Sequence, residues 1–173
     1  MTTPSEERRA HIVAILREGD GPTTGAALST TLGVSRQAIV NDIAILRASG
    51  EPIHGSPRGY FLGEGAGGGT LAQLACVHDR DASRDELEIL VDRGIMVLDV
   101  VVEHELYGEV QASMMVSSRA DVDRYMDALI SSGAKPLSSL TNGVHVHHVR
   151  APSPDALEAA KRDLAGRGFL LED

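Results

Sequence analysis

Several features of secreted and membrane proteins are missing from this sequence. It contains a single cysteine, Cys76, so no disulfide can form within the chain, and a reducing compartment is the simplest setting. Residues 1–9 are polar and charged, and no apolar stretch typical of a signal peptide follows them. The most apolar run, residues 95–102, contains Asp99 and is far too short to span a bilayer. The sequence therefore predicts a cytoplasmic protein that does not contact a membrane.

Positive charge is also scarce, because 16 Lys and Arg residues face 25 Asp and Glu residues, a net charge of -9. Residues 1–62 carry six arginines and six acidic residues and are neutral. Residues 63–173 carry ten basic and nineteen acidic residues, and therefore all of the net negative charge. An acidic second half would repel nucleic-acid phosphates, so we expect the two halves to serve different functions.

Five glycines in residues 63–69 mark the boundary between these halves. Such a segment predicts a flexible linker and not a packed element. We find no internal repeat. The expected architecture is α+β: a DNA-binding domain in residues 1–62, a linker in 63–69 and a sheet-and-helix sensor domain in 70–173.

The first half reads as three helices and a hairpin. Helices are predicted from near Ser5 to Gly19, from Thr23 or Thr24 to Leu32, and from Ser35 to Arg47, and two short strands within 53–62. Gly33 suits the tight turn of a helix-turn-helix, and Ser35 suits the cap of its recognition helix. The exposed face of that helix offers side chains that can contact bases, and Arg58 lies at the tip of the hairpin. The predicted DNA contacts are Ser35, Arg36, Gln37, Asn41 and Arg58.

Residues 5–62 resemble the winged helix of the biotin-operon-repressor type. That family includes full ligases, but this chain lacks the length for a ligase domain. The alternative is a three-helix domain used for protein contacts, in which Arg36 and Asn41 are merely solvated.

The second half alternates strands and helices. Strands are predicted at 70–78, 95–103, 107–116 and 143–150, and a short one at 169–171. Helices are predicted at 84–92, 119–131 and 154–166, each preceded by a serine that can cap it: Ser83, Ser118 and Ser153. Strand directions stay open.

Five of the seven histidines lie after the linker. Alternation along a strand puts His145 and His147 on one face, about 6.6 Å apart, where both imidazoles can converge on one ion. His78 ends another strand, a good place for a third ligand. Glu86 could supply a carboxylate, but Ser83 and Glu86 also form a capping box, and the rival carboxylates are Asp79, Asp81 and Glu88.

The segments around His78, 99–109, 117–122 and 137–147 together resemble the three-histidine (3H) domain. With the winged helix before it, the chain is similar to the niacin-responsive repressors of NAD biosynthesis and niacin salvage genes. This resemblance implies one divalent transition metal per chain (Zn, Ni, Fe or similar), held by His78, Glu86, His145 and His147. It also implies a homodimer on double-stranded operator DNA, with nicotinic acid as co-repressor.

The effector could bind His104, Tyr107 and Arg119, since a helix N-terminus with a guanidinium can hold an anion. The sequence therefore predicts a non-enzymatic repressor. Two alternatives stay open: a pure metal sensor, and a metal-dependent hydrolase with Glu103, Glu105 or Glu109 as base. Whether the effector tightens or loosens DNA binding is not determined by the sequence.

Overall fold

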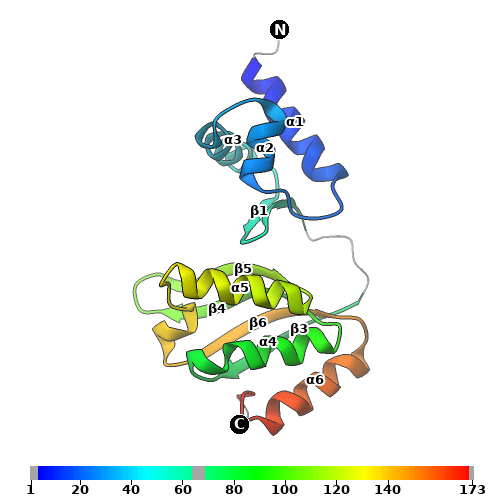
Figure 1. Ribbon diagram of the computed structural model, residues 1–173, viewed down its shortest axis with the longest axis vertical. Helices are drawn as coiled ribbons and strands as arrows, with labels where there is room; N and C mark the ends of the chain where they lie inside the picture. The colour runs from blue at the N-terminus through cyan, green and yellow to red at the C-terminus, as the bar shows by residue number, and fades with distance from the viewer. Residues whose placement is uncertain (1–3, 64–68, 172–173) are drawn as a thin grey trace. The chain divides into compact units, whose positions relative to one another are not determined.

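The computed structural model describes residues 4–63 and 69–171 (Figure 1). The chain divides into two units, Met1–Ala66 and Gly67–Asp173, and each has its own hydrophobic core. Most of the predicted linker, residues 64–68, lies outside the described residues. Within the described ranges, no helix is long and apolar enough to cross a membrane.

The first unit is a three-helix domain with a two-stranded wing. Its elements are α1 (Pro4–Glu18), α2 (Gly25–Leu32), α3 (Arg36–Ala48), β1 (Ile53–Ser56) and β2 (Gly59–Leu62). Thr24 and Ser35 cap α2 and α3 by accepting hydrogen bonds from the amides of Ala27 and Ala38. Between the helices Gly33 adopts a left-handed conformation, φ 65°. The predicted helix-turn-helix is therefore confirmed.

The wing is attached to the helical part through Thr23. The amides of Thr23 and Tyr60 each donate to the carbonyl of the other at 2.8 Å. This approach requires Gly59, because a Cβ there would lie 2.4 Å from the Thr23 carbonyl oxygen.

The second unit is a four-stranded antiparallel sheet, in the order β3-β6-β4-β5, covered by three helices. Its elements are β3 (Thr70–Val77), η1 (Arg80–Ala82), α4 (Ser83–Asp92), β4 (Met96–His104), β5 (Gly108–Val116), α5 (Arg119–Ser131), η2 (Leu137–Thr141), β6 (Val144–Ala151) and α6 (Pro154–Gly166). The predicted boundaries of these strands and of α4, α5 and α6 agree within one residue. The predicted last strand is a single bridge, in which Leu170 pairs with Cys76.

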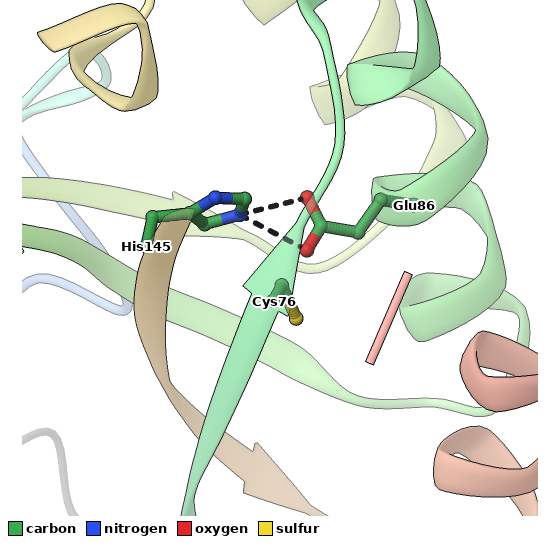
Figure 2. A group of neighbouring side chains, drawn as sticks. All are labelled: Cys76, Glu86 and His145. Atoms are coloured by element: carbon green, nitrogen blue, oxygen red, sulfur yellow. Dashed lines mark hydrogen bonds and ion pairs between the residues drawn. The ribbon is translucent and has the colours of Figure 1, made fainter. Parts of the chain in front are cut away.

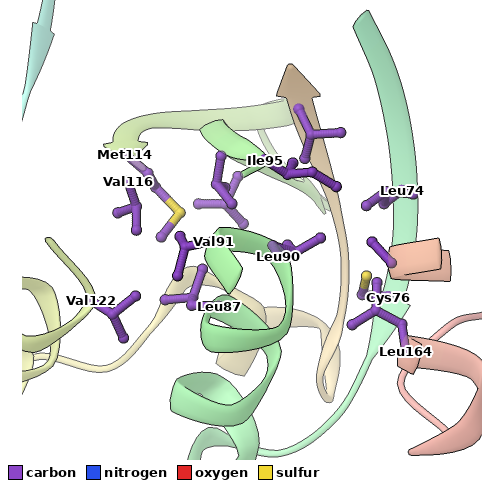
Figure 3. Packing of buried hydrophobic residues seen from close by; sticks show 14 of the residues in the cluster. Leu74, Cys76, Leu87, Leu90, Val91, Ile95, Met114, Val116, Val122 and Leu164 are labelled. Atoms are coloured by element: carbon purple, nitrogen blue, oxygen red, sulfur yellow. The ribbon is translucent and has the colours of Figure 1, made fainter. Parts of the chain in front are cut away.

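One core holds this unit together. Leu87, Leu90 and Val91 of α4 pack between the sheet and the neighbouring helices (Figure 3). Val122 of α5 and Leu164 of α6 belong to the same buried cluster. Since a single cluster joins all three helices, they cover one face of the sheet.

The predicted serine caps were right at two helices and wrong at the third. Ser118 and Ser153 accept from the amides of Asp121 and Ala156. At α4, however, Ala82 is the N-cap residue, and Ser83 is already helical and buried. The chain enters α4 from η1, where Asp79 caps the turn by accepting from the Ala82 amide at 3.1 Å. The capping box of Ser83 and Glu86 therefore does not form.

Candidate metal centre and nucleic-acid interface

The two strands β3 and β6 bring the donor side chains onto one face of the sheet. Along β6 burial alternates, so His145 and His147 are buried and Val144 and His148 lie on the opposite face. His145 stands directly opposite Cys76 in the antiparallel register. His78 follows β3, two residues after Cys76, and its side chain is also buried.

Glu86 of α4 points toward His145 from the helix side (Figure 2). Its Oε2 lies 2.7 Å from His78 Nε2 and 3.4 Å from His147 Nε2, and its Oε1 lies 3.1 Å from His145 Nε2. The glutamate is 2% exposed. The fold therefore brings together the four side chains that the sequence resemblance implied as metal ligands.

Each of the three imidazoles is oriented by a backbone carbonyl. His78 Nδ1 lies 2.7 Å from the Asp79 oxygen, His145 Nδ1 2.8 Å from the Gly143 oxygen, and His147 Nδ1 2.7 Å from the Asp99 oxygen. A carbonyl oxygen only accepts, so each Nδ1 must donate its hydrogen. In the neutral ring, Nε2 then carries a lone pair directed at the Glu86 carboxylate. Carbonyl partners of this kind fix the tautomer of metal-binding histidines.

Three lone pairs facing a carboxylate require a cation between them, either a metal ion or protons. The pKa shifts of Glu86, His78 and His147 agree with this need for positive charge. Burial acts to raise the pKa of Glu86, but the imidazoles around it hold that pKa well below its usual range. Conversely, burial acts to lower the pKa of His78 and His147, but the charge and hydrogen bonds of Glu86 raise both.

The donor set fits a transition metal. Three imidazole nitrogens and one carboxylate suit Zn, Ni, Fe or a similar divalent ion, whereas Ca²⁺ and Mg²⁺ prefer oxygen ligands. The three rival carboxylates lie elsewhere. Asp79 caps η1, Glu88 pairs with Arg84 and Arg119, and Asp81 is exposed.

Gly143 allows the two strands to approach at this point. Its φ is 93°, and a Cβ there would lie 2.2 Å from the carbonyl oxygen of His78. The carbonyl of Gly143 also accepts from the backbone amide of His78 and from His145 Nδ1. One glycine thus positions two of the imidazoles.

Beside the histidines lies a small pocket that is open to solvent. His78, Glu86, His145 and His147 are among the residues that line it. The other lining residues are mostly apolar: Ser83, Leu87, Val100, Met114, Tyr125, Pro136, Leu137 and Ser138. Burial and the charge of Glu86 raise the pKa of Tyr125, which keeps its hydroxyl protonated. The pocket therefore offers apolar walls and a polar end at the candidate metal centre.

The three residues predicted to hold an effector are not brought together. His104 and Tyr107 flank the turn after β4, where His104 Nδ1 accepts from the amides of Leu106 and Tyr107. Arg119 lies beyond the far end of the β4–β5 hairpin and pairs with Asp92 and Glu88. None of the three lines the pocket.

The exposed face of α3 is suited to contact a nucleic acid. Arg36, Gln37 and Asn41 are exposed, while Ile39 and Ile43 are buried in the core. Gln37 Nε2 donates to Asn41 Oδ1 at 3.0 Å, which leaves the Gln37 carbonyl and the Asn41 amide free to contact bases. The one acid of α3, Asp42, is buried and pairs with Arg8 at 2.6 Å and with Arg9 at 3.5 Å. No carboxylate of α3 therefore repels phosphates from this face.

Ser35 and Arg58 are placed differently from these three side chains. Ser35 Oγ accepts from the Ala38 amide, so its hydroxyl caps the helix. Arg58 is half-buried in the turn between β1 and β2, where its amide donates to Ser56 Oγ at 3.1 Å.

The fold and site together define a DNA-binding regulator: a helix-turn-helix domain followed by a separate domain with a buried histidine–carboxylate centre. Comparison with known proteins gives the family. Residues 72–173 match the model of the 3H domain, and residues 8–61 match a helix-turn-helix (HTH) domain. The chain belongs to the 3H-domain family.

Two relatives share this arrangement over their whole length. The chain is 39% identical to the probable transcription repressor NiaR of Thermotoga maritima, over 100% of this chain and 98% of the relative. It is 36% identical to the transcription repressor NadR of Bacillus subtilis, over 96% and 94%. The resemblance seen in the sequence is therefore confirmed.

Cys76 is not among the residues predicted from the sequence to lie at the site. Its sulfur, a carboxylate oxygen of Glu86 and a ring nitrogen of His145 all lie within 4.8 Å of one another (Figure 2). The signal was present in the sequence, because Cys76 and His78 alternate in the same way as His145 and His147.

Proposed function

We propose that this protein is a repressor of genes for NAD biosynthesis or niacin salvage, with nicotinic acid as co-repressor. It binds operator DNA as a homodimer and is not an enzyme. The observation that carries this proposal is the buried cluster of three histidines and Glu86 beside an open pocket, in a chain that begins with a helix-turn-helix. The relatives are named as a probable transcription repressor and a transcription repressor, which supports repression as the function.

In the proposed centre, the metal ion is held by His78, Glu86, His145 and His147. When bound, the ion supplies a Lewis acid that can accept a nitrogen or oxygen donor from a ligand in the pocket. The carbonyls of Asp79, Gly143 and Asp99 orient the three imidazoles that would hold the ion. Fixed imidazoles keep the site formed before a ligand arrives.

The pocket suits a small aromatic acid better than the separated trio of His104, Tyr107 and Arg119 does. Nicotinate has a flat ring, which the apolar side chains of Val100, Met114 and Leu137 can contact. It also has a pyridine nitrogen and a carboxylate, either of which can meet the metal. The hydroxyls of Tyr125 and Ser138 can donate hydrogen bonds to its other polar group.

Calorimetric titration of the metal-loaded protein with nicotinate, nicotinamide and biotin tests this function. We expect saturable binding of nicotinate, weaker binding of nicotinamide and none of biotin. The apoprotein serves as the control and should bind none of the three. If the metal alone switches operator binding in gel shifts and nicotinate adds nothing, the protein is a metal sensor and the co-repressor proposal fails.

A further inference from the structure

Among the residues that the structure describes, Cys76 is a further metal-donor side chain at the centre that the site described above does not use. It is fully buried, at 0% exposure, on the β3 side of the cluster and is not among the residues that line the pocket. Its sulfur lies within 4.8 Å of a carboxylate oxygen of Glu86.

The register of the two strands places the sulfur where a ligand of the same ion belongs. Cys76 is the antiparallel partner of His145, and Leu74 is the partner of His147. The donor atoms of Cys76, Glu86 and His145 lie within 4.8 Å of one another. Donors bound to one ion are about 3–4.4 Å apart, so the cluster has to contract by about 1 Å to close around an ion.

Charge gives an independent reason for a second anionic ligand. A divalent ion held by three neutral imidazoles and Glu86 leaves one net positive charge in a site where Glu86 is 2% exposed. An uncompensated buried charge is costly. A thiolate from Cys76 would make the centre neutral.

We propose that Cys76 is a fifth, sulfur ligand of the metal ion and makes the centre selective for thiophilic ions. This inference rests on the proposed metal centre. On coordination the S–H bond of Cys76 breaks, a sulfur–metal bond forms, and the proton passes to solvent. Cys76 lies in β3 and is not among the residues that line the pocket, so a sulfur ligand there would leave the pocket accessible to an effector. Thiolate ligands favour Zn, Co and Cd over Mn and Mg.

Cobalt(II) loading of the full chain tests the proposal by absorption spectroscopy. We expect the visible d–d bands of bound cobalt together with a sulfur-to-cobalt charge-transfer band in the near ultraviolet. Because the chain has one cysteine, a thiolate band can come only from Cys76. The wild-type spectrum therefore decides the question even if a cysteine variant fails to fold.

Variants then assign the band. Cys76→Ser and Cys76→Ala should keep the d–d bands and lose the charge-transfer band. Met114→Leu removes the thioether that lines the pocket and should leave the band unchanged. In competition titrations, Cys76→Ala should lower the affinity for Cd²⁺ by more than about tenfold, the loss typical of removing even an outer partner of a metal site, and leave that for Mn²⁺ nearly unchanged.

Two outcomes would overturn the inference. Cobalt d–d bands without the charge-transfer band would show that the ion binds through nitrogen and oxygen alone. If no cobalt binds at all, the proposed metal centre is excluded, and the sulfur ligand is excluded with it. Gel shifts on the same samples separate these results from the proposed function, since a protein without the band that still binds operator with nicotinate remains a repressor.

Discussion

At the scale of single residues, the centre depends on orientation as much as on donor type. Each imidazole donates Nδ1–H to a carbonyl, so each Nε2 lone pair points at Glu86. Asp99 shows how closely the orientation of the imidazoles is linked to the sheet. Its carbonyl orients His147, while its carboxylate accepts from His148 Nδ1 at 2.7 Å. Replacing a ligand and replacing a residue that orients one should therefore have different consequences.

Replacing both strand histidines should remove the metal. In the variant His145→Ala/His147→Ala, two of the five proposed ligands are lost and only His78, Glu86 and Cys76 remain, so the affinity should fall too far for the ion to survive purification. Elemental analysis of the purified protein should show loss of the ion, while the first unit stays folded by circular dichroism. His104→Ala, which changes an exposed turn, is the control and should keep full occupancy. Full occupancy in the double variant would exclude these two residues as ligands.

Gly143→Ala should weaken the centre without changing a ligand. A Cβ at this position would lie 2.2 Å from the His78 carbonyl oxygen, so β3 and β6 must separate. We expect metal affinity to fall by about tenfold or more and the free energy of unfolding to fall by about 1–3 kcal/mol.

Gly133→Ala is a matched control for this change. Gly133 also has a positive φ, 66°, but nothing lies within 4 Å of its Cβ position. It should lose some stability in thermal unfolding and keep its metal affinity. Equal metal affinities in the two glycine variants would mean that Gly143 does not position the histidines.

At the scale of elements, helix α3 exposes polar side chains along one face that can contact bases in a DNA groove. Ser35 fixes where the helix begins, and the pairing of Asp42 with Arg8 ties it to α1. The exposed side chains of Arg36, Gln37 and Asn41 then follow one side of the first two turns. This is the arrangement in which a recognition helix reads bases through its N-terminal half.

Arg36→Ala and Asn41→Ala should each weaken specific binding to a palindromic operator by about 1–3 kcal/mol, the contribution of a good base contact. Gel shifts at fixed salt measure this. Arg17→Ala removes the same charge from an exposed position on α1 and controls for electrostatics. If Arg36→Ala and Asn41→Ala bind operator as tightly as the wild type, α3 is not the reading element.

At the scale of the whole molecule, the question is how a ligand in one unit changes DNA binding by the other. Five glycines in residues 63–69 predict a segment too flexible to transmit torque. In the homodimer we propose, the second units would instead set the separation of two winged helices. Helix-turn-helix dimers read half-sites about 34 Å apart, so modest changes in that separation change affinity.

Such coupling must be reciprocal. If nicotinate tightens operator binding by some factor, saturating operator must tighten nicotinate binding by the same factor. Titration of nicotinate with and without operator measures this directly, and DNA of unrelated sequence is the control. Equal nicotinate affinities in the presence and absence of operator would contradict an allosteric co-repressor.

The sequence by itself determined the two domains and nearly every helix and strand, because helical and strand periodicity, caps and glycine turns are local signals. It also indicated that His145 and His147 share a face. Local signals misled at Ser83 and Glu86, where the spacing of a capping box matched but η1 changed how the chain enters α4. Only the tertiary structure decided that Glu86 turns inward to meet three imidazoles, and that His104 and Tyr107 lie away from Arg119. It alone placed Cys76 beside Glu86, since the register of β3 against β6 depends on packing between segments about seventy residues apart.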